Sequence, residues 1–86
     1  MRLLYHMTPH ENLESIFEKG LVPAYNFVSL CENPNSWYRD YARLIVDIEA
    51  FMKEYPEVRV TTWHPELDEI CVWGRIPPKF IGRAWK

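Results

Sequence analysis

The chain has 86 residues, a formal net charge of −2 and 48% hydrophobic residues. This length allows one small domain and leaves no room for a second. The acidic balance argues against a dedicated nucleic-acid surface, and no apolar run is long enough to span a membrane. Residues 1–12 lack the apolar core of a signal peptide, and the two cysteines and three histidines show no metal-ligand spacing. We therefore expect a cytoplasmic protein without a metal ion.

The beginning of the chain predicts a strand followed by a helix. Arg2–His6 (RLLYH) is apolar and short, as a buried strand is. A helix over 9–19 follows, because Thr8 fits the N-cap position and Glu11 closes a capping box three residues later. Gly20 stands where a C-cap residue in the left-handed conformation belongs.

The rest of the chain predicts short strands with brief connections. A short helix over 35–42 and a helical turn over 50–55 interrupt them. Short connections after the first helix favour an antiparallel or mixed sheet. The predicted fold class is α+β, with one main N-terminal helix. The later strands are predicted over Phe27–Cys31, Arg43–Glu49, Val58–Trp63, Glu69–Trp73 and Ile81–Trp85.

Four polar residues are candidates for a site. His6 and Thr8 lie at the junction of the first strand and helix, where side chains and unpaired N–H groups converge on one spot. Ser29 lies inside an apolar strand, and Glu69 directly precedes another. A carboxylate carried into a cleft would stabilise a developing positive charge. The alternatives are a helix cap, a strand-end histidine, an outward-facing serine and a solvated loop acid.

Other residues have a structural explanation beside a functional one. Cys31 and Cys71 lie among apolar neighbours with no histidine at motif spacing, so we expect inert core thiols rather than nucleophiles. Aromatic residues at helical spacing could stack a planar ring or pack a helix face, and arginines four apart could grip a phosphate or face solvent. These residues are Trp37, Tyr38, Tyr41, Arg39 and Arg43.

Four stretches occur in a characteristic order. They are LYHMT with ENLESI and KGL (4–21), FVSL with ENP (27–34), RLIVDIE (43–49) and DEICVWGRIPPKFI (68–81). Together they resemble the ADP-ribosyltransferase-like fold family. The similarity covers most of the chain and is nearest to the DNA-targeting ADP-ribosyltransferase toxins and the RNA 2′-phosphotransferases.

The resemblance implies a split β-sheet that grips NAD in a cleft between two small sheets. His6 and Thr8 match the first motif, where the histidine contacts the cofactor ribose and the adjoining backbone holds the nicotinamide amide. Ser29 matches a second-strand position that lines the same cleft. Glu69 matches the glutamate that orients the acceptor and supports the oxocarbenium-like state.

The expected function is therefore that of a minimal NAD-dependent ADP-ribosyltransferase with a macromolecular acceptor, either protein or nucleic acid. The low charge disfavours nucleic acid. A second interpretation stays open, because Val22–Asn26 hold no basic residue where the toxins carry a catalytic arginine. In that interpretation the chain is a catalytically inactive binding module that acts through a protein partner, with aromatic side chains as anchors.

Overall fold

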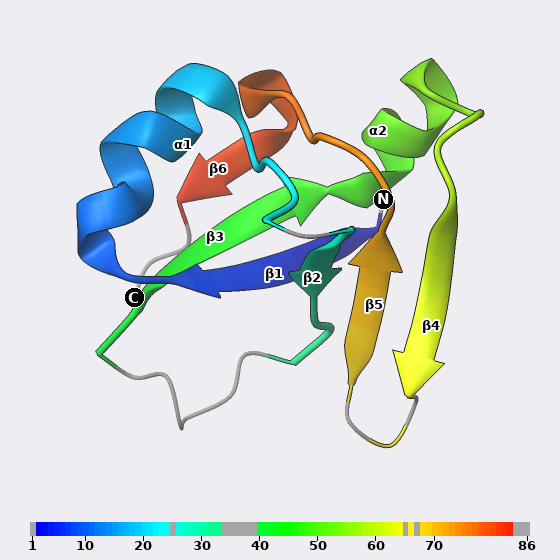
Figure 1. The fold of residues 1–86 in the computed structure, drawn as a ribbon, viewed down its shortest axis with the longest axis horizontal. Helices are drawn as coiled ribbons and strands as arrows, with labels where there is room; N and C mark the ends of the chain where they lie inside the picture. Colours follow the sequence, from blue (N-terminus) through cyan, green and yellow to red (C-terminus); the bar gives the residue numbers. More distant parts are fainter. Residues whose placement is uncertain (1, 25, 34–39, 65, 67, 84–86) are drawn as a thin grey trace.

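The computed structural model describes residues 2–24, 26–33, 40–64, 66 and 68–83, and Figure 1 shows how their elements are arranged. The radius of gyration is 12.0 Å, and a compact domain of this length is expected to have about 12 Å. The described elements, in chain order, are β1 (Leu3–Thr8), the 3-10 helix η1 (His10–Asn12), α1 (Leu13–Lys19), β2 (Val28–Leu30), β3 (Ala42–Asp47), α2 (Ile48–Glu54), β4 (Val60–His64), β5 (Glu69–Val72), the 3-10 helix η4 (Pro78–Phe80) and β6 (Ile81–Arg83).

The strands form two three-stranded sheets. In the first sheet β3 lies between β1 and β6, and in the second β5 lies between β2 and β4. All of these pairings are antiparallel, so the sheets are antiparallel rather than mixed. The combination of these sheets with helices confirms the predicted α+β class. The two sheets meet where Tyr5 of β1 and Cys31 exchange backbone hydrogen bonds of 2.8 and 2.9 Å.

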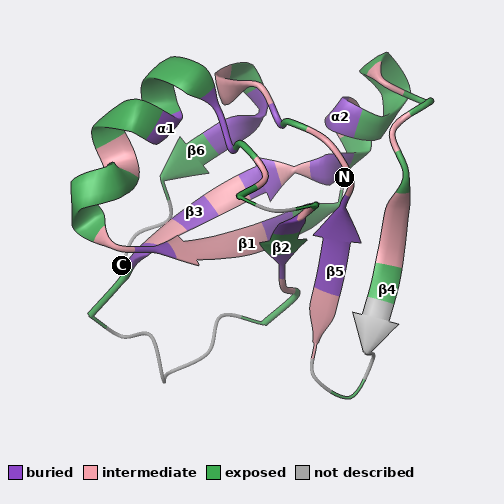
Figure 2. Ribbon diagram, in the orientation of Figure 1, coloured by how far each residue is buried: buried purple, intermediate pink, exposed green. Residues whose placement is uncertain are grey.

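The core lies between the sheets and the helices. Every second residue of β3 is buried, as strand geometry requires when one face packs inward. Figure 2 shows this alternation along β3 and an almost continuous buried stretch in β5. Phe51 of α2 is fully buried and packs against Phe80 with ring centroids 5.6 Å apart. The largest fully buried side chains are Phe51, Leu4, Leu30, Leu44, Ile48, Ile76, Val46, Val72 and Cys71.

The predicted start of the first helix is wrong. Thr8 is the last residue of β1 and pairs with Ala42 of β3, so its backbone is extended, and the helical region begins with η1 and continues as α1. No side-chain cap bond is formed at either start, and the Thr8 hydroxyl accepts a hydrogen bond from Asn12 Nδ2 at 3.1 Å. The predicted capping box does not form because Pro9 is also extended, with ψ 144°, so Thr8 lies one residue too early to cap the helical region.

The other end of α1 follows the sequence prediction. Gly20 has φ 90°, and its N–H donates to the carbonyl of Ile16 at 2.7 Å. A Cβ atom at this position would overlap the backbone carbonyl of Ile76. Glycine is therefore required here by its positive φ and by the close approach of Leu21 and Ile76, which pair through their backbones.

A second helix of equal length replaces the helical turn predicted over 50–55. Helices α1 and α2 have seven residues each, so the prediction of one main helix is wrong. Asp47 caps α2, because its Oδ1 accepts a hydrogen bond from the N–H of Ala50 at 3.1 Å. The same short helix buries Ile48 and Phe51 completely.

Candidate functional site

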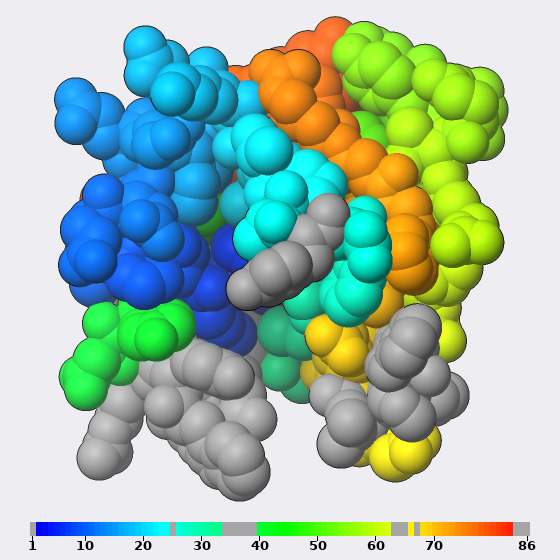
Figure 3. All heavy atoms as spheres, viewed as in Figure 1, coloured from blue at the N-terminus to red at the C-terminus, as the bar shows by residue number. Residues whose placement is uncertain are grey.

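Three of the four predicted site residues come from three different strands that meet at the junction of the sheets. His6 lies in β1, Ser29 is the middle residue of β2, and Glu69 is the first residue of β5. The backbone pair between Tyr5 and Cys31 holds β1 against the end of β2. In the space-filling view, the blue surface of β1, the teal surface of β2 and the yellow beginning of β5 lie next to one another (Figure 3).

Ser29 holds the carboxylate of Glu69. The Ser29 hydroxyl donates to Glu69 Oε2 at 2.8 Å. Ser29 pairs with Cys71 in the β2–β5 register, and Glu69 lies two residues before Cys71 and so on the same face of the sheet. This diagonal placement is within reach of long side chains. The bond to an ionised carboxylate is of the charge-assisted kind and directs one oxygen of Glu69 toward β2.

His6 is anchored to the backbone of the same serine. Its Nδ1 lies 2.9 Å from the carbonyl oxygen of Ser29, and a carbonyl oxygen only accepts, so Nδ1 carries the proton. Burial lowers the pKa of His6 from its ordinary value, against an opposing contribution from this hydrogen bond. The ring is therefore neutral at pH 7, and its Nε2 has a lone pair that can accept a hydrogen bond from a ligand.

Thr8 is placed differently from the other three. It shares a strand face with His6, because the two are separated by two positions in β1. Its side chain is only 3% exposed, and its hydroxyl accepts a hydrogen bond from Asn12 rather than contacting the group formed by His6, Ser29 and Glu69. A contact between Thr8 and a cofactor stays a prediction.

The remaining sequence candidates divide between the described residues and the rest. Trp37, Tyr38 and Arg39 lie outside the described residues. The helix predicted over 35–42 is wrong at its end, because Ala42 begins β3. Arg43 neighbours Leu44, which pairs with His6, so alternation places Arg43 on the opposite face of the sheet from His6.

Cys71 is buried in the core, as the sequence predicts, whereas Cys31 is only partly buried. Burial raises the pKa of the Cys31 thiol, and the carboxylate of Asp68 raises it further. Burial likewise raises the pKa of the Cys71 thiol, and the carboxylate of Glu69 raises it further. Both side chains are free cysteines that stay protonated at neutral pH. Since the thiolate is the nucleophilic form, neither cysteine is activated for catalysis.

Sequence reasoning missed Asp68, which it did not select as a site residue. Its two carboxylate oxygens accept hydrogen bonds from the backbone N–H groups of Glu32 and Asn33, at 2.9 and 2.8 Å. The residue directly precedes Glu69 and has a positive φ of 54°. The available signal was an aspartate before a strand, because aspartate tolerates the left-handed region better than most residues.

An aromatic group also lies on the β2–β5–β4 sheet. The rings of Phe27 and Trp73 are 5.1 Å apart, and the guanidinium carbon of Arg59 lies 4.5 Å from the centroid of Trp73. The indole N–H of Trp73 donates to the hydroxyl of Thr61 at 2.9 Å. The members of this group contact one another, so we interpret the group as packing between adjacent parts of the chain rather than as a binding site.

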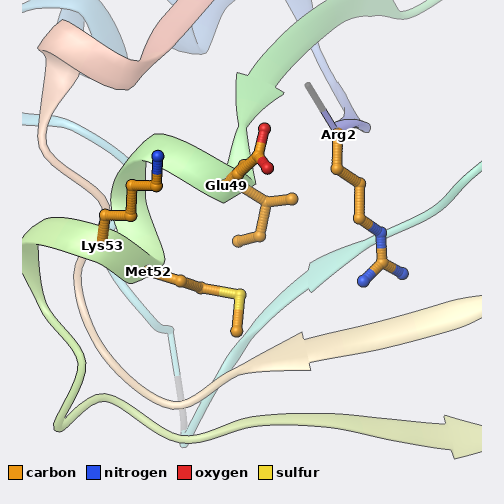
Figure 4. A pocket seen from close by; sticks show the side chains of 5 residues that line it. Arg2, Glu49, Met52 and Lys53 are labelled. Carbon is orange, nitrogen blue, oxygen red and sulfur yellow. The ribbon is translucent and has the colours of Figure 1, made fainter.

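A cavity of about 300 Å³ lies at a different place. Figure 4 shows Arg2 on one side of it and Glu49, Met52 and Lys53 of α2 on the other. Arg2 also forms an ion pair with Glu32 at 3.4 Å. The cavity shares no lining residue with the group formed by His6, Ser29 and Glu69, so it is not the cleft that the sequence resemblance implies.

Comparison of the chain with models of known protein families and with curated proteins finds no match. Among the described residues, no group of His, Cys, Asp and Glu side chains is arranged to hold a metal ion. Neither helix in the described part of the chain has the length and apolar character needed to cross a membrane.

Proposed function

We propose that the two sheets form a small version of the ADP-ribosyltransferase-like fold, and that the chain is a minimal NAD-dependent ADP-ribosyltransferase acting on a macromolecular acceptor. One observation carries the proposal. Hydrogen bonds of 2.8 and 2.9 Å join Glu69 and His6 through Ser29, and these are three of the four residues that the sequence resemblance assigns to one NAD site. They come from strands of two sheets that meet edge to edge, as a cleft between sheets requires.

The donors and acceptors of the group suit NAD as a substrate. NAD would supply the ADP-ribosyl group, whose glycosidic bond breaks with the electron pair leaving on nicotinamide, so that positive charge develops on the ribose. The Glu69 carboxylate would stabilise that charge, because the Ser29 hydroxyl holds one of its oxygens in place before the reaction. Nε2 of neutral His6 would accept a hydrogen bond from a ribose hydroxyl.

Ser29 has a supporting part in this arrangement. Its hydroxyl fixes Glu69 Oε2, and its carbonyl fixes the ring of His6, so one residue orients both groups relative to each other. Oε1 of Glu69 would then receive the proton that the acceptor group loses as its bond to the ribose forms. A carboxylate held in place before the reaction needs no reorganisation during it.

Two measurements test the proposal. The first is an NMR titration with NAD of the wild type, His6→Ala and the control His10→Ala, which replaces an exposed histidine of η1. We expect shifts at His6, Ser29 and Glu69 that persist in the control and vanish in His6→Ala. No shifts at millimolar NAD would reject the NAD site and leave the inactive binding module as the function to pursue.

The second measurement is nicotinamide release from NAD, which needs no identified acceptor because water can take the ribosyl group. We expect Glu69→Gln to lower the rate about a hundredfold while the NAD-induced shifts remain. The matched control is Glu57→Gln, which removes an exposed acid in the turn before β4 and is expected to leave the rate unchanged. Equal rates in the wild type and Glu69→Gln would contradict the role of Glu69.

A further inference from the structure

The carboxylate of Asp68 ties the beginning of β5 to the chain that follows β2. Its Oδ1 and Oδ2 accept from the backbone N–H groups of Glu32 and Asn33, two consecutive residues, at 2.9 and 2.8 Å. Hydrogen bonds to an ionised carboxylate are about twice as strong as neutral ones. The left-handed conformation of Asp68, with φ 54°, is unfavourable for a residue that carries a Cβ atom. Such a conformation persists where the surroundings fix it, and these two bonds provide that constraint.

The two hydrogen bonds of Asp68 lie where the regular pairing of β5 ends on both sides. The β2–β5 register stops at Leu30↔Ile70, after which the chain turns to pair with β1. On the other side, the β4–β5 register is irregular immediately before the pair His64↔Glu69. Ladder hydrogen bonds therefore constrain Glu69 less than the residues that follow it. The bonds of Asp68 act at this position, one residue away.

We propose that Asp68 is a positioning residue, which holds the start of β5 so that the carboxylate of Glu69 stays on the Ser29 hydroxyl. The inference concerns geometry, and only its consequence for turnover rests on the proposed function. Asp68 does not contact the reacting atoms in this mechanism. It acts through Glu69, by fixing the backbone from which the Glu69 side chain extends toward β2.

Glycine and asparagine at this position separate the carboxylate from the backbone conformation. Asp68→Gly keeps the positive φ without strain and removes both acceptors. Asp68→Asn tolerates the same φ but keeps one acceptor oxygen and presents an NH₂ group to the second N–H. Asp40→Asn, in the exposed turn before β3, is the matched control for the loss of one negative charge.

The first readout is the Glu69 side chain itself, measured by NMR three-bond couplings that report its χ1 rotamer. We expect one rotamer in the wild type and in Asp40→Asn, averaging between rotamers in Asp68→Gly, and an intermediate result in Asp68→Asn. Amide exchange at Glu32 and Asn33 is expected to accelerate about tenfold in Asp68→Gly. A single unchanged Glu69 rotamer in Asp68→Gly would overturn the proposal, and this result does not depend on any activity.

The second readout is the division between kcat and KM for nicotinamide release. We expect Asp68→Gly to lower kcat about ten- to a hundredfold, because misplacement of a reacting group by about 1 Å has an effect of that size, while KM for NAD changes less than twofold. Averaging of the Glu69 rotamer with unchanged kcat would leave the positioning inference intact and contradict the proposed role of Glu69. A parallel fall in kcat and folded fraction would indicate a structural role alone, which circular dichroism on the same samples detects.

Discussion

The two sheets are both three-stranded and antiparallel, but they differ in the lengths of their strands and in the side-chain hydrogen bonds between those strands. In the β1–β3–β6 sheet, β1 and β3 have six residues each and pair along their whole length, β6 has three residues, and β3 buries every second side chain. In the β2–β5–β4 sheet, β2 has three residues, β5 has four, and the pairing with β4 contains an irregularity. Both sheets contribute buried residues to the apolar core, but only the second has side-chain hydrogen bonds that hold the beginning of β5 to the chain of β2 and after it.

This difference separates stability from function in the chain. Of the side chains that bond across strands near the candidate site, Ser29, Asp68 and Glu69 belong to the second sheet or to the chain beside it, and His6 belongs to the first. A polar bond of this kind contributes about 1 kcal/mol net, whereas a buried aromatic side chain contributes several. Substitutions in the packed region should therefore unfold the protein, and those at the end of β5 should leave it folded with altered chemistry.

The largest expected effect is in the packed region. Phe51→Ala should lower the free energy of unfolding by about 3–5 kcal/mol, because Phe51 is fully buried and contacts the rings of Tyr55 and Phe80. Urea unfolding measures the change. The matched control is Met52→Ala, the next residue of α2, whose side chain is 42% exposed and should cost less than about 1 kcal/mol. Similar losses in the two variants would contradict the assignment of the core to this face of α2.

How far the sequence predicts the fold depends on how local each signal is. The strand around Ile45 and the glycine at position 20 were predicted because a short apolar run and the end of a helical pattern are readable over a few residues. The start of α1 was not, since its capping pattern is local but the pairing of Thr8 with Ala42 joins residues far apart in sequence. The cap of α2 by Asp47 was missed because the preceding strand and the short helix share one apolar run.

The next effect is at the junction of the sheets. Ser29→Ala removes the bond to Glu69 and should lower the free energy of unfolding by about 1 kcal/mol. Nicotinamide release should fall about tenfold, because Glu69 loses the group that orients it. Ser15→Ala, on the exposed side of α1, is the control and should change neither quantity. A loss of several kcal/mol on Ser29→Ala would show that this hydrogen bond is needed for folding, and would remove the contrast between the packed region and the end of β5.

The site was predictable to the extent that its residues belong to motifs with recognisable neighbours. His6, Ser29 and Glu69 were identified in this way, and the structure joins them by hydrogen bonds. Asp68 was not identified, because its role depends on a positive φ and on backbone groups 35 and 36 positions earlier in the chain. A single sequence carries little trace of either, so residues that position a site are harder to find than residues that form it.

The smallest expected effect is a pH dependence of stability that originates at His6. Burial lowers its pKa in the folded protein below the ordinary value of 6.5, so between these two pKa values the unfolded chain binds more protons than the folded one. Stability therefore rises with pH through this window and is lost as the pH falls below about 6.5. Comparison of urea unfolding from pH 5 to 7.5 for the wild type and His6→Gln isolates the contribution, and His10→Gln is the control. The wild type should show the steeper loss toward acid, by less than the change on Ser29→Ala. Parallel curves for the wild type and His6→Gln would mean that His6 is solvated, and that β1 is held at the junction by the Tyr5–Cys31 backbone pair without help from the ring.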